Sequence, residues 1–252
     1  MSNASLAEKE RFIELLRSNN AEEAERVLQK HLELLRWTDN SGRRAVHWAA
    51  SGGCLEIVEF CVSQDENDAS LEDDMGWSPL MIACSAGRLD VVRFLLSLPQ
   101  VQPNTPNVNG QTALHYAVSK NRPQITSLLL QNGSNVNAQD RYRATPLHRA
   151  ASQGHEKIVS LLLAHPGLQI DLKDSEGCSA LHLASEEGRE DVAIYLAERG
   201  ANINLENNEK KTPLDLARTP ELQSKLKAAA ERAKAELLIS SSVLKPAKDV
   251  FR

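Results

Sequence analysis

Short stretches of apolar residues at helical spacing alternate with polar turns along most of this chain of 252 residues. In residues 91–96 the apolar side chains recur three and four positions apart, so they share one face of a helix. Upstream, Ser78 followed by Pro79 has the form of an N-cap with proline at the first helical position, and Gly87 suits the end of that helix. The same order recurs along the chain and predicts an all-α fold built from pairs of short helices.

One phrase of eight residues occurs six times, and its final alanines lie 34, 34, 33, 34 and 33 residues apart. A period near 33 with a Thr-Pro-Leu-His-x-Ala core resembles the ankyrin-repeat family, in which a finger-like turn precedes two antiparallel helices. The resemblance implies an ankyrin-repeat solenoid of about seven helix-turn-helix repeats, each burying its apolar face against its neighbours. The six copies occupy residues 42–49, 76–83, 110–117, 143–150, 177–184 and 210–217.

The two ends of the chain differ from the repeats between them. Residues 6–18 and 21–36 are expected to form two helices with charged outer faces, which suits the polar cap that an end repeat needs. Near the other end, Leu222, Leu226 and Ala229 begin an apolar stripe that predicts an extra helix against the last repeat. The expected organisation is an N-terminal capping repeat at 1–37, six repeats at 38–218, a capping helix at 219–239 and a disordered tail at 240–252.

Composition and charge restrict the class of partner. Hydrophobic residues make up 41% of the chain and charged residues 25%, which indicates a folded protein rather than a disordered one. The net charge of −5 offers no basic surface for nucleic acid or an anionic membrane. No segment approaches the roughly 18 apolar residues of a membrane span, and the first residues lack the pattern of a secretory signal. We therefore expect an intracellular protein with reduced cysteines that binds neither nucleic acid nor membrane.

Four histidines at the same place in successive copies raise the question of a metal or catalytic site. Packed helices lie about 8 to 10 Å apart, whereas zinc needs every ligand within about 2.1 Å, so these histidines cannot share an ion. We expect each of them to hydrogen-bond backbone groups and to tie neighbouring fingers together. No phosphate-binding, zinc-protease or nucleophile motif is present, and the prediction is a protein without catalytic residues, metal or cofactor. The histidines are His47, His115, His148 and His182.

Function is expected where the copies depart from their consensus. Trp48, Tyr116 and Arg149 follow the histidine position, where other copies carry Ile or Leu, and Arg43 and Trp77 follow the glycine position. Trp, Tyr and Arg are the residue types enriched at interface hot spots, which favours a binding surface on the side of the fingers and first helices. The alternative is that these side chains serve packing between repeats.

Charged residues on the same side fall into bands of alternating sign. Asp74 lies in an acidic band, Lys120 in a basic one, and Glu186 and Glu187 in a second acidic band. Alternating bands would set the register of a partner that carries the complementary pattern. Scattered, solvated charge is the alternative interpretation.

Within the ankyrin-repeat family, the variable positions resemble the gankyrin family of proteasome assembly chaperones. The resemblance implies a monomeric chaperone of the cytoplasm and nucleus whose concave side grips the C-terminal domain of an AAA-ATPase subunit of the 26S proteasome base. It assigns contact roles to Arg43, Trp48, Asp74, Trp77, Tyr116, Lys120 and Arg149. The segments that carry it are 45–48, 56–60, 76–80, 85–88, 114–122, 144–151 and 206–214. A general ankyrin adaptor, or an inhibitor of a kinase or transcription factor, is the alternative function.

Removal of residues 240–252 is expected to change the melting temperature by less than about 2 °C, because terminal segments outside the packed repeats contribute little to stability. Thermal denaturation followed by circular dichroism measures this. A larger fall would mean that these residues pack against the fold.

Overall fold

A computed structural model describes residues 4–243, with side chains up to residue 236. All regular elements in this range are helical, as predicted, and no strand is assigned. The chain divides between Arg141 and Tyr142 into two compact units, which are described separately. No helix within the described range is long and apolar enough to cross a membrane.

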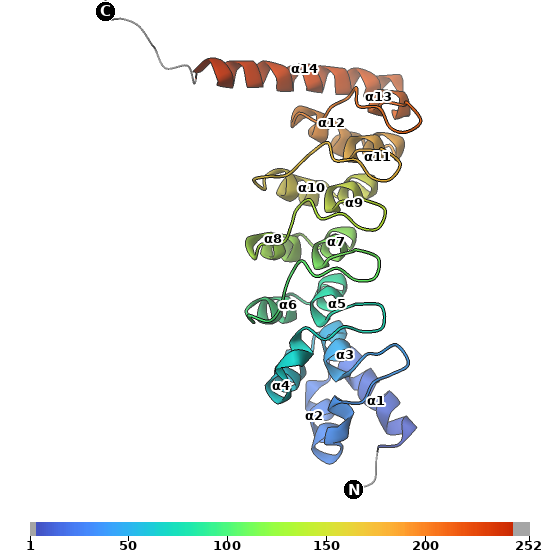
Figure 1. Ribbon diagram of the computed structural model, residues 1–252, viewed down its shortest axis with the longest axis vertical. Coiled ribbons are helices and arrows are strands. Elements are labelled where there is room, and N and C mark those ends of the chain that lie inside the picture. Colours follow the sequence, from blue (N-terminus) through green and yellow to red (C-terminus); the bar gives the residue numbers. More distant parts are fainter. Residues whose placement is uncertain (1–3, 244–252) are drawn as a thin grey trace, which may run out of the picture. The chain divides into compact units, whose positions relative to one another are not determined.

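The first unit contains the N-terminal capping repeat and three further helix pairs. Helices α3, α5 and α7 stack as one layer with the finger loops beside them, and α4, α6 and α8 form the second layer (Figure 1). Two short 3₁₀ helices, η1 and η2, follow α2 and α4. The elements are α1 (Leu6–Arg17), α2 (Ala21–Lys30), η1 (Leu32–Leu35), α3 (Ala45–Gly52), α4 (Leu55–Gln64), η2 (Glu66–Ala69), α5 (Pro79–Ala86), α6 (Leu89–Leu96), α7 (Ala113–Ser119) and α8 (Pro123–Gln131).

The second unit repeats this arrangement and ends in a long helix. That helix, α14, packs against α12 (Figure 1). Its side chains Leu222, Leu226 and Ala229, which begin the predicted apolar stripe, are buried. Two ion pairs, Lys225 with Glu190 at 3.3 Å and Arg232 with Glu198 at 3.2 Å, join the same helices. The elements are α9 (Pro146–Gln153), α10 (Glu156–Leu163), α11 (Ala180–Glu186), α12 (Glu190–Glu198), α13 (Pro213–Leu216) and α14 (Pro220–Val243).

The local sequence explains where the inner helices begin and end. Before α9, the extended backbone of Thr145 lets its hydroxyl accept a hydrogen bond from the backbone amide of His148, and Pro146 occupies the first helical position. The helix ends at Gly154, whose φ of 74° lies in the left-handed region that glycine adopts without strain. Each signal acts within a few residues of the chain and was therefore visible in the sequence.

The recurring alanine of the eight-residue phrase lies where inner helices pack. Ala49, Ala83 and Ala117 are completely buried, and α5 packs against both α3 and α7. A small side chain there lets neighbouring helices approach closely. At the C-terminal end of α3, a β-carbon on Gly52 would overlap the backbone carbonyl of Leu16 in α1, so this contact requires glycine.

Backbone hydrogen bonds join each finger to the next one within its unit. In the first unit, the amide of Asp74 donates to the carbonyl of Ser41 at 3.0 Å, and the amide of Val108 donates to Met75 at 3.2 Å. In the second unit, the amide of Ser175 donates to Tyr142 at 2.8 Å. Exposed loops therefore have their backbone groups partly paired, which holds the fingers in register.

The predicted role of the histidines is confirmed for three of them. Nδ1 of His47 accepts from the amide of Arg44 at 3.1 Å, and Nε2 donates to the carbonyl of Leu71 at 3.0 Å. The same second bond runs from His148 to Cys178 at 2.9 Å and from His182 to Lys211 at 3.2 Å. His115 accepts in the same way from the amide of Thr112 at 3.1 Å. Each bridging histidine thus joins the start of its helix to the following finger.

Two predicted boundaries differ from the structure. Helix α2 ends at Lys30 instead of continuing to residue 36, because His31 has φ −137° and the chain continues as the 3₁₀ helix η1. At the other end, α14 continues to Val243 and includes residues 240–243, which were assigned to the tail. The rest of the predicted tail, residues 244–252, lies outside the described residues.

The free energy of unfolding is expected to fall as the pH is lowered from about 7.5 to about 5.5. Burial lowers the pKa of His47 and of His182 below the ordinary value of 6.5. At pH values between the lowered pKa of the folded chain and the ordinary pKa of the unfolded chain, the imidazole is protonated only in the unfolded chain. The stability that the neutral histidine contributes is therefore fully present at higher pH and is lost on acidification. The expected loss is up to about 1 kcal/mol per histidine, measured by urea denaturation at several pH values.

The matched variant for this measurement is His47→Asn. It should unfold more easily by about 1–3 kcal/mol, because the carbonyl of Leu71 loses its donor, and its stability should decline less with falling pH. An equal decline in wild type and variant would contradict the assignment to His47.

Candidate protein-binding surface

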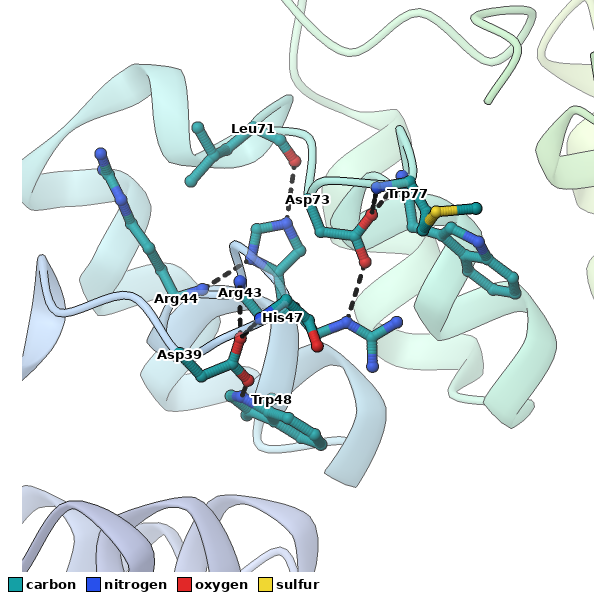
Figure 2. Close-up of polar contacts among 10 residues, drawn as sticks. Asp39, Arg43, Arg44, His47, Trp48, Leu71, Asp73 and Trp77 are labelled. Carbon is teal, nitrogen blue, oxygen red and sulfur yellow. Dashed lines mark hydrogen bonds and ion pairs between the residues drawn. The ribbon is translucent and has the colours of Figure 1, made fainter. Parts of the chain in front are cut away.

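The first predicted contact residue, Trp48, is held in place by three neighbours. It lies in α3, and its indole Nε1 donates to Oδ2 of Asp39 at 3.1 Å (Figure 2). The guanidinium of Arg43 lies 5.4 Å from the ring centroid, and that of Arg17 in α1 lies 5.7 Å from it. These distances are within the range of cation–π attraction. The half-buried indole is therefore oriented by the protein itself.

Arg43 connects the first finger to the second. Its Nε donates to Oδ2 of Asp73 at 2.9 Å, and the Asp73 side chain is only 2% exposed (Figure 2). The other oxygen of Asp73 accepts from the amides of Met75 and Trp77, at 2.9 and 2.8 Å. Arg43 therefore has a structural role in addition to the contact role predicted for it, since it pairs the carboxylate that organises the second finger.

Trp77 and Tyr116 form an aromatic pair between neighbouring repeats. Their ring centroids lie 4.0 Å apart with the planes inclined by 37°. The Tyr116 hydroxyl donates to Oε1 of Gln111 at 2.7 Å and accepts from Nδ2 of Asn107 at 2.7 Å. Both rings are half-buried, so they serve packing between repeats and also present part of their surface to solvent. The packing interpretation is thus confirmed at this pair, and the contact role of the two residues stays a prediction.

The charged members of the surface are more exposed than the aromatic ones. Asp74 and Lys120 are exposed, and neither forms an ion pair with a side chain in residues 4–236. Lys120 is the C-cap residue of α7. We call Arg43, Trp48, Asp74, Trp77, Tyr116 and Lys120 the finger-side surface of the first unit.

The remaining predicted contact residues belong to the second unit. Arg149 is half-buried in α9, and Glu186 and Glu187 are exposed at the end of α11. Arg218 contacts both glutamates: its Nε donates to the backbone carbonyl of Glu186, and its Nη2 lies 3.8 Å from Oε2 of Glu187. Part of this acidic band is therefore neutralised by the following repeat.

Two features of this side were not predicted. The residue after the helix-ending glycine is often arginine, and Nε of Arg88 donates to the carbonyl of Ser51 at 2.9 Å, as Nε of Arg189 does to Ser152 at 3.0 Å. The recurring Gly-Arg pair was the sequence signal for this bond between repeats. At the tips of two fingers, Met75 and Val108 are 52% and 48% exposed, which places apolar surface beside Asp74.

The described side chains were compared with two kinds of reactive site, a metal centre and an activated thiol. Within residues 4–236, no group of three or more His, Cys, Asp or Glu residues is placed to hold a metal ion. All four thiols are buried, and burial raises the pKa of Cys54 to about 11 and that of Cys61 to about 12. Thiols with such pKa values stay protonated at neutral pH and are poor nucleophiles.

Comparisons with known proteins agree with this geometry. The family described as "Ankyrin repeats (3 copies)" matches residues 9–107, 61–140, 97–174 and 139–207. A Saccharomyces cerevisiae protein, "Probable 26S proteasome regulatory subunit p28", is 34% identical over 197 residues, which cover 76% of this chain and 86% of that protein. The "Ankyrin repeat-containing protein C6C3.08" of Schizosaccharomyces pombe is 32% identical over 43% of this chain and 47% of its own length.

A solved structure is also similar. The crystal structure of the ankyrin repeat domain of Bcl-3, described as a unique member of the IkappaB protein family, has a TM-score of 0.74 and 26% sequence identity. The likeness covers 90% of this chain and all of that domain.

The Trp77 and Tyr116 side chains are expected to be energetically coupled. In a double-mutant cycle with Trp77→Ala and Tyr116→Ala, the coupling in the free energy of unfolding should be about 0.5–1.5 kcal/mol, as for other aromatic pairs in contact. Urea denaturation of the four proteins gives this value. Additive effects within about 0.3 kcal/mol would show that the pair contributes no interaction of its own.

Proposed function

The chain belongs to the ankyrin-repeat family, and from that premise we propose that it is a non-catalytic chaperone for assembly of the 26S proteasome regulatory particle. In this proposal it grips the C-terminal domain of an AAA-ATPase subunit of the proteasome base. The observation that carries the proposal is the 34% identity to a proteasome regulatory subunit over most of both chains. The bound chaperone would act sterically, by delaying contact between the base and the core particle.

The finger-side surface supports a protein partner. Trp48, Trp77 and Tyr116 are held by hydrogen bonds, ring contacts or a neighbouring arginine before any partner binds. Side chains that are already ordered lose little rotamer freedom on binding, so more of the contact energy appears as affinity. Aromatic side chains with solvent-facing area are also the common anchors of protein interfaces.

The exposed charges give the proposed partner a chemical description. Asp74 and Lys120 lie in the first unit, and Glu186 and Glu187 lie in the second. A partner that places a basic group against Asp74 and an acidic group against Lys120 would complement the first unit. Such exposed pairs determine specificity and association rate more than affinity. The proposal also locates the protein in the cytoplasm and nucleus, as a monomer.

A general adaptor or an inhibitor of a kinase or transcription factor is the second candidate. The similarity to the ankyrin repeat domain of Bcl-3 keeps this candidate open, because it shows the same fold in a protein whose description names no proteasome. The two candidates differ in which protein is captured by the same surface.

Affinity capture from a cell extract should recover a proteasomal ATPase subunit with the wild-type protein, and Lys120→Glu should weaken this binding at least tenfold, about 1.4 kcal/mol. The combined change Arg43→Ala and Trp48→Ala should abolish capture. Mass spectrometry identifies the partner, and titration calorimetry with the purified ATPase C-terminal domain gives the affinity.

Lys157→Glu is the matched charge reversal, because Lys157 is an exposed residue of α10 outside the finger-side surface, and it should bind as wild type. Melting temperatures of all variants separate lost binding from lost folding, which matters most for Arg43 because of its ion pair with Asp73. Recovery of other proteins only, with no ATPase subunit, would contradict the proteasome proposal and favour the second candidate.

A further inference from the structure

Two outer helices of the second unit, α10 and α12, have a groove between them. The inner helices α9 and α11 separate α10 and α12 from the finger loops of the same unit (Figure 1). The groove has a volume of about 640 Å³, within the range of about 300–1,000 Å³ that is usual for ligand sites. Most of its lining side chains are exposed or half-buried. It is therefore open to solvent and suits part of a protein chain better than an enclosed small molecule.

Apolar side chains of α12 line this groove. Val192 is buried, and Ile194 and Tyr195 are half-buried. Nη2 of Arg199 donates to the Tyr195 hydroxyl at 2.6 Å, and the same guanidinium lies 4.8 Å from the ring centroid. The hydroxyl also lies 3.4 Å from Oγ of Ser160 on α10. The ring is therefore held in place before anything binds, which reduces the entropy that binding would cost.

A short side chain on α10 keeps the apolar surface accessible. Ser160 is the fifth residue of α10, and the fifth residue of α6 in the first unit is the exposed Arg93. An arginine can cover neighbouring apolar surface with its aliphatic stem, whereas a serine cannot. The fifth residue of α12 is Ile194. A short polar residue on one helix and an aliphatic residue on the next thus leave apolar surface open between them.

The charges that line the groove are mostly negative. The carboxylates of Glu156, Asp191 and Glu198 line it together with the ammonium group of Lys157. Glu198 pairs with Arg232 of α14 at 3.2 Å. Glu156 and Asp191 are exposed in the first turns of α10 and α12, and neither forms an ion pair with a side chain in residues 4–236. Two carboxylates without a basic partner therefore lie beside the apolar surface.

We propose that the groove between α10 and α12 is a second protein-binding site, which takes a basic segment with an apolar side chain next to a lysine or arginine. The apolar side chain packs against Ile194 and Tyr195, and the basic group pairs with Glu156 or Asp191. Burial of apolar surface provides the affinity, and the carboxylates select the sign of the partner's charge. The site uses the outer helices rather than the fingers, so it does not depend on the proposed proteasomal role.

Two synthetic peptides, Gly-Ser-Lys-Phe-Lys-Ser-Gly and Gly-Ser-Glu-Phe-Glu-Ser-Gly, test the site by nuclear magnetic resonance titration of the full chain. The basic peptide should bind with a dissociation constant below about 1 mM and shift the signals of Ile194 and Tyr195. The acidic peptide should bind at least about fivefold more weakly, because it meets carboxylates of its own sign. Equal binding of the two peptides, or no binding of the basic peptide at about 5 mM, would overturn the proposal.

Four variants locate the binding within the groove. Ser160→Arg introduces the residue that α6 has at this position, and it should abolish binding of the basic peptide by filling the groove. Asp191→Lys should weaken binding about fivefold and Lys157→Glu should strengthen it about twofold, since exposed charge pairs contribute modestly. Asp90→Lys changes the residue of α6 that corresponds to Asp191, and this matched control should bind as wild type.

The replaced side chains are all exposed, so the variants should fold, and their melting temperatures check this. Lys157→Glu should still capture the ATPase subunit as wild type does, so the two proposals can fail separately. Wild-type affinity of Ser160→Arg for the basic peptide, or equal losses in Asp191→Lys and Asp90→Lys, would contradict the site. Removal of residues 244–252 should leave the affinity unchanged, and a gain would mean that these residues, not a partner, compete for the groove.

Discussion

The placement of the fingers depends on two hydrogen bonds of a recurring histidine, one at each ring nitrogen. In His47, His148 and His182, Nδ1 faces a backbone amide, which can only donate, so the proton must lie on Nε2. Nε2 then donates to a carbonyl of the following repeat. One residue therefore closes the start of its own helix and positions the next finger. In the last copy Asp215 makes only the local half, accepting from the amide of Thr212 at 2.8 Å.

The side chains of the candidate binding surface are held in place by contacts between the same fingers. Asp73 orders the second finger through two backbone amides and also pairs with Arg43 of the first, so the position of the guanidinium depends on the register between fingers. Trp77 and Tyr116 meet across the next pair of repeats. Residues that stabilise the stack are thus also those whose exposed parts can contact a partner. This leaves Asp74 and Lys120 as the members whose change should affect binding with the least effect on folding.

The groups around His47 explain why its ring stays neutral in the folded chain. The ring of His47 is buried between an amide and a carbonyl, and burial lowers its pKa because a charged ring would lose its hydration. Acidification is therefore expected to weaken the hydrogen bonds that His47 makes within and between repeats.

The sequence by itself determined the helical repeat, the start and end of the inner helices and the bridging role of the histidines, because those features depend on residues within one period of the chain. It also identified the variable residues on the finger side. Only the tertiary structure decided that α2 stops at Lys30, that Arg43 is paired with Asp73 and that Trp77 contacts Tyr116. The last two outcomes depend on distances between side chains 30 or more residues apart, and these are set by how closely successive repeats pack rather than by their spacing in sequence.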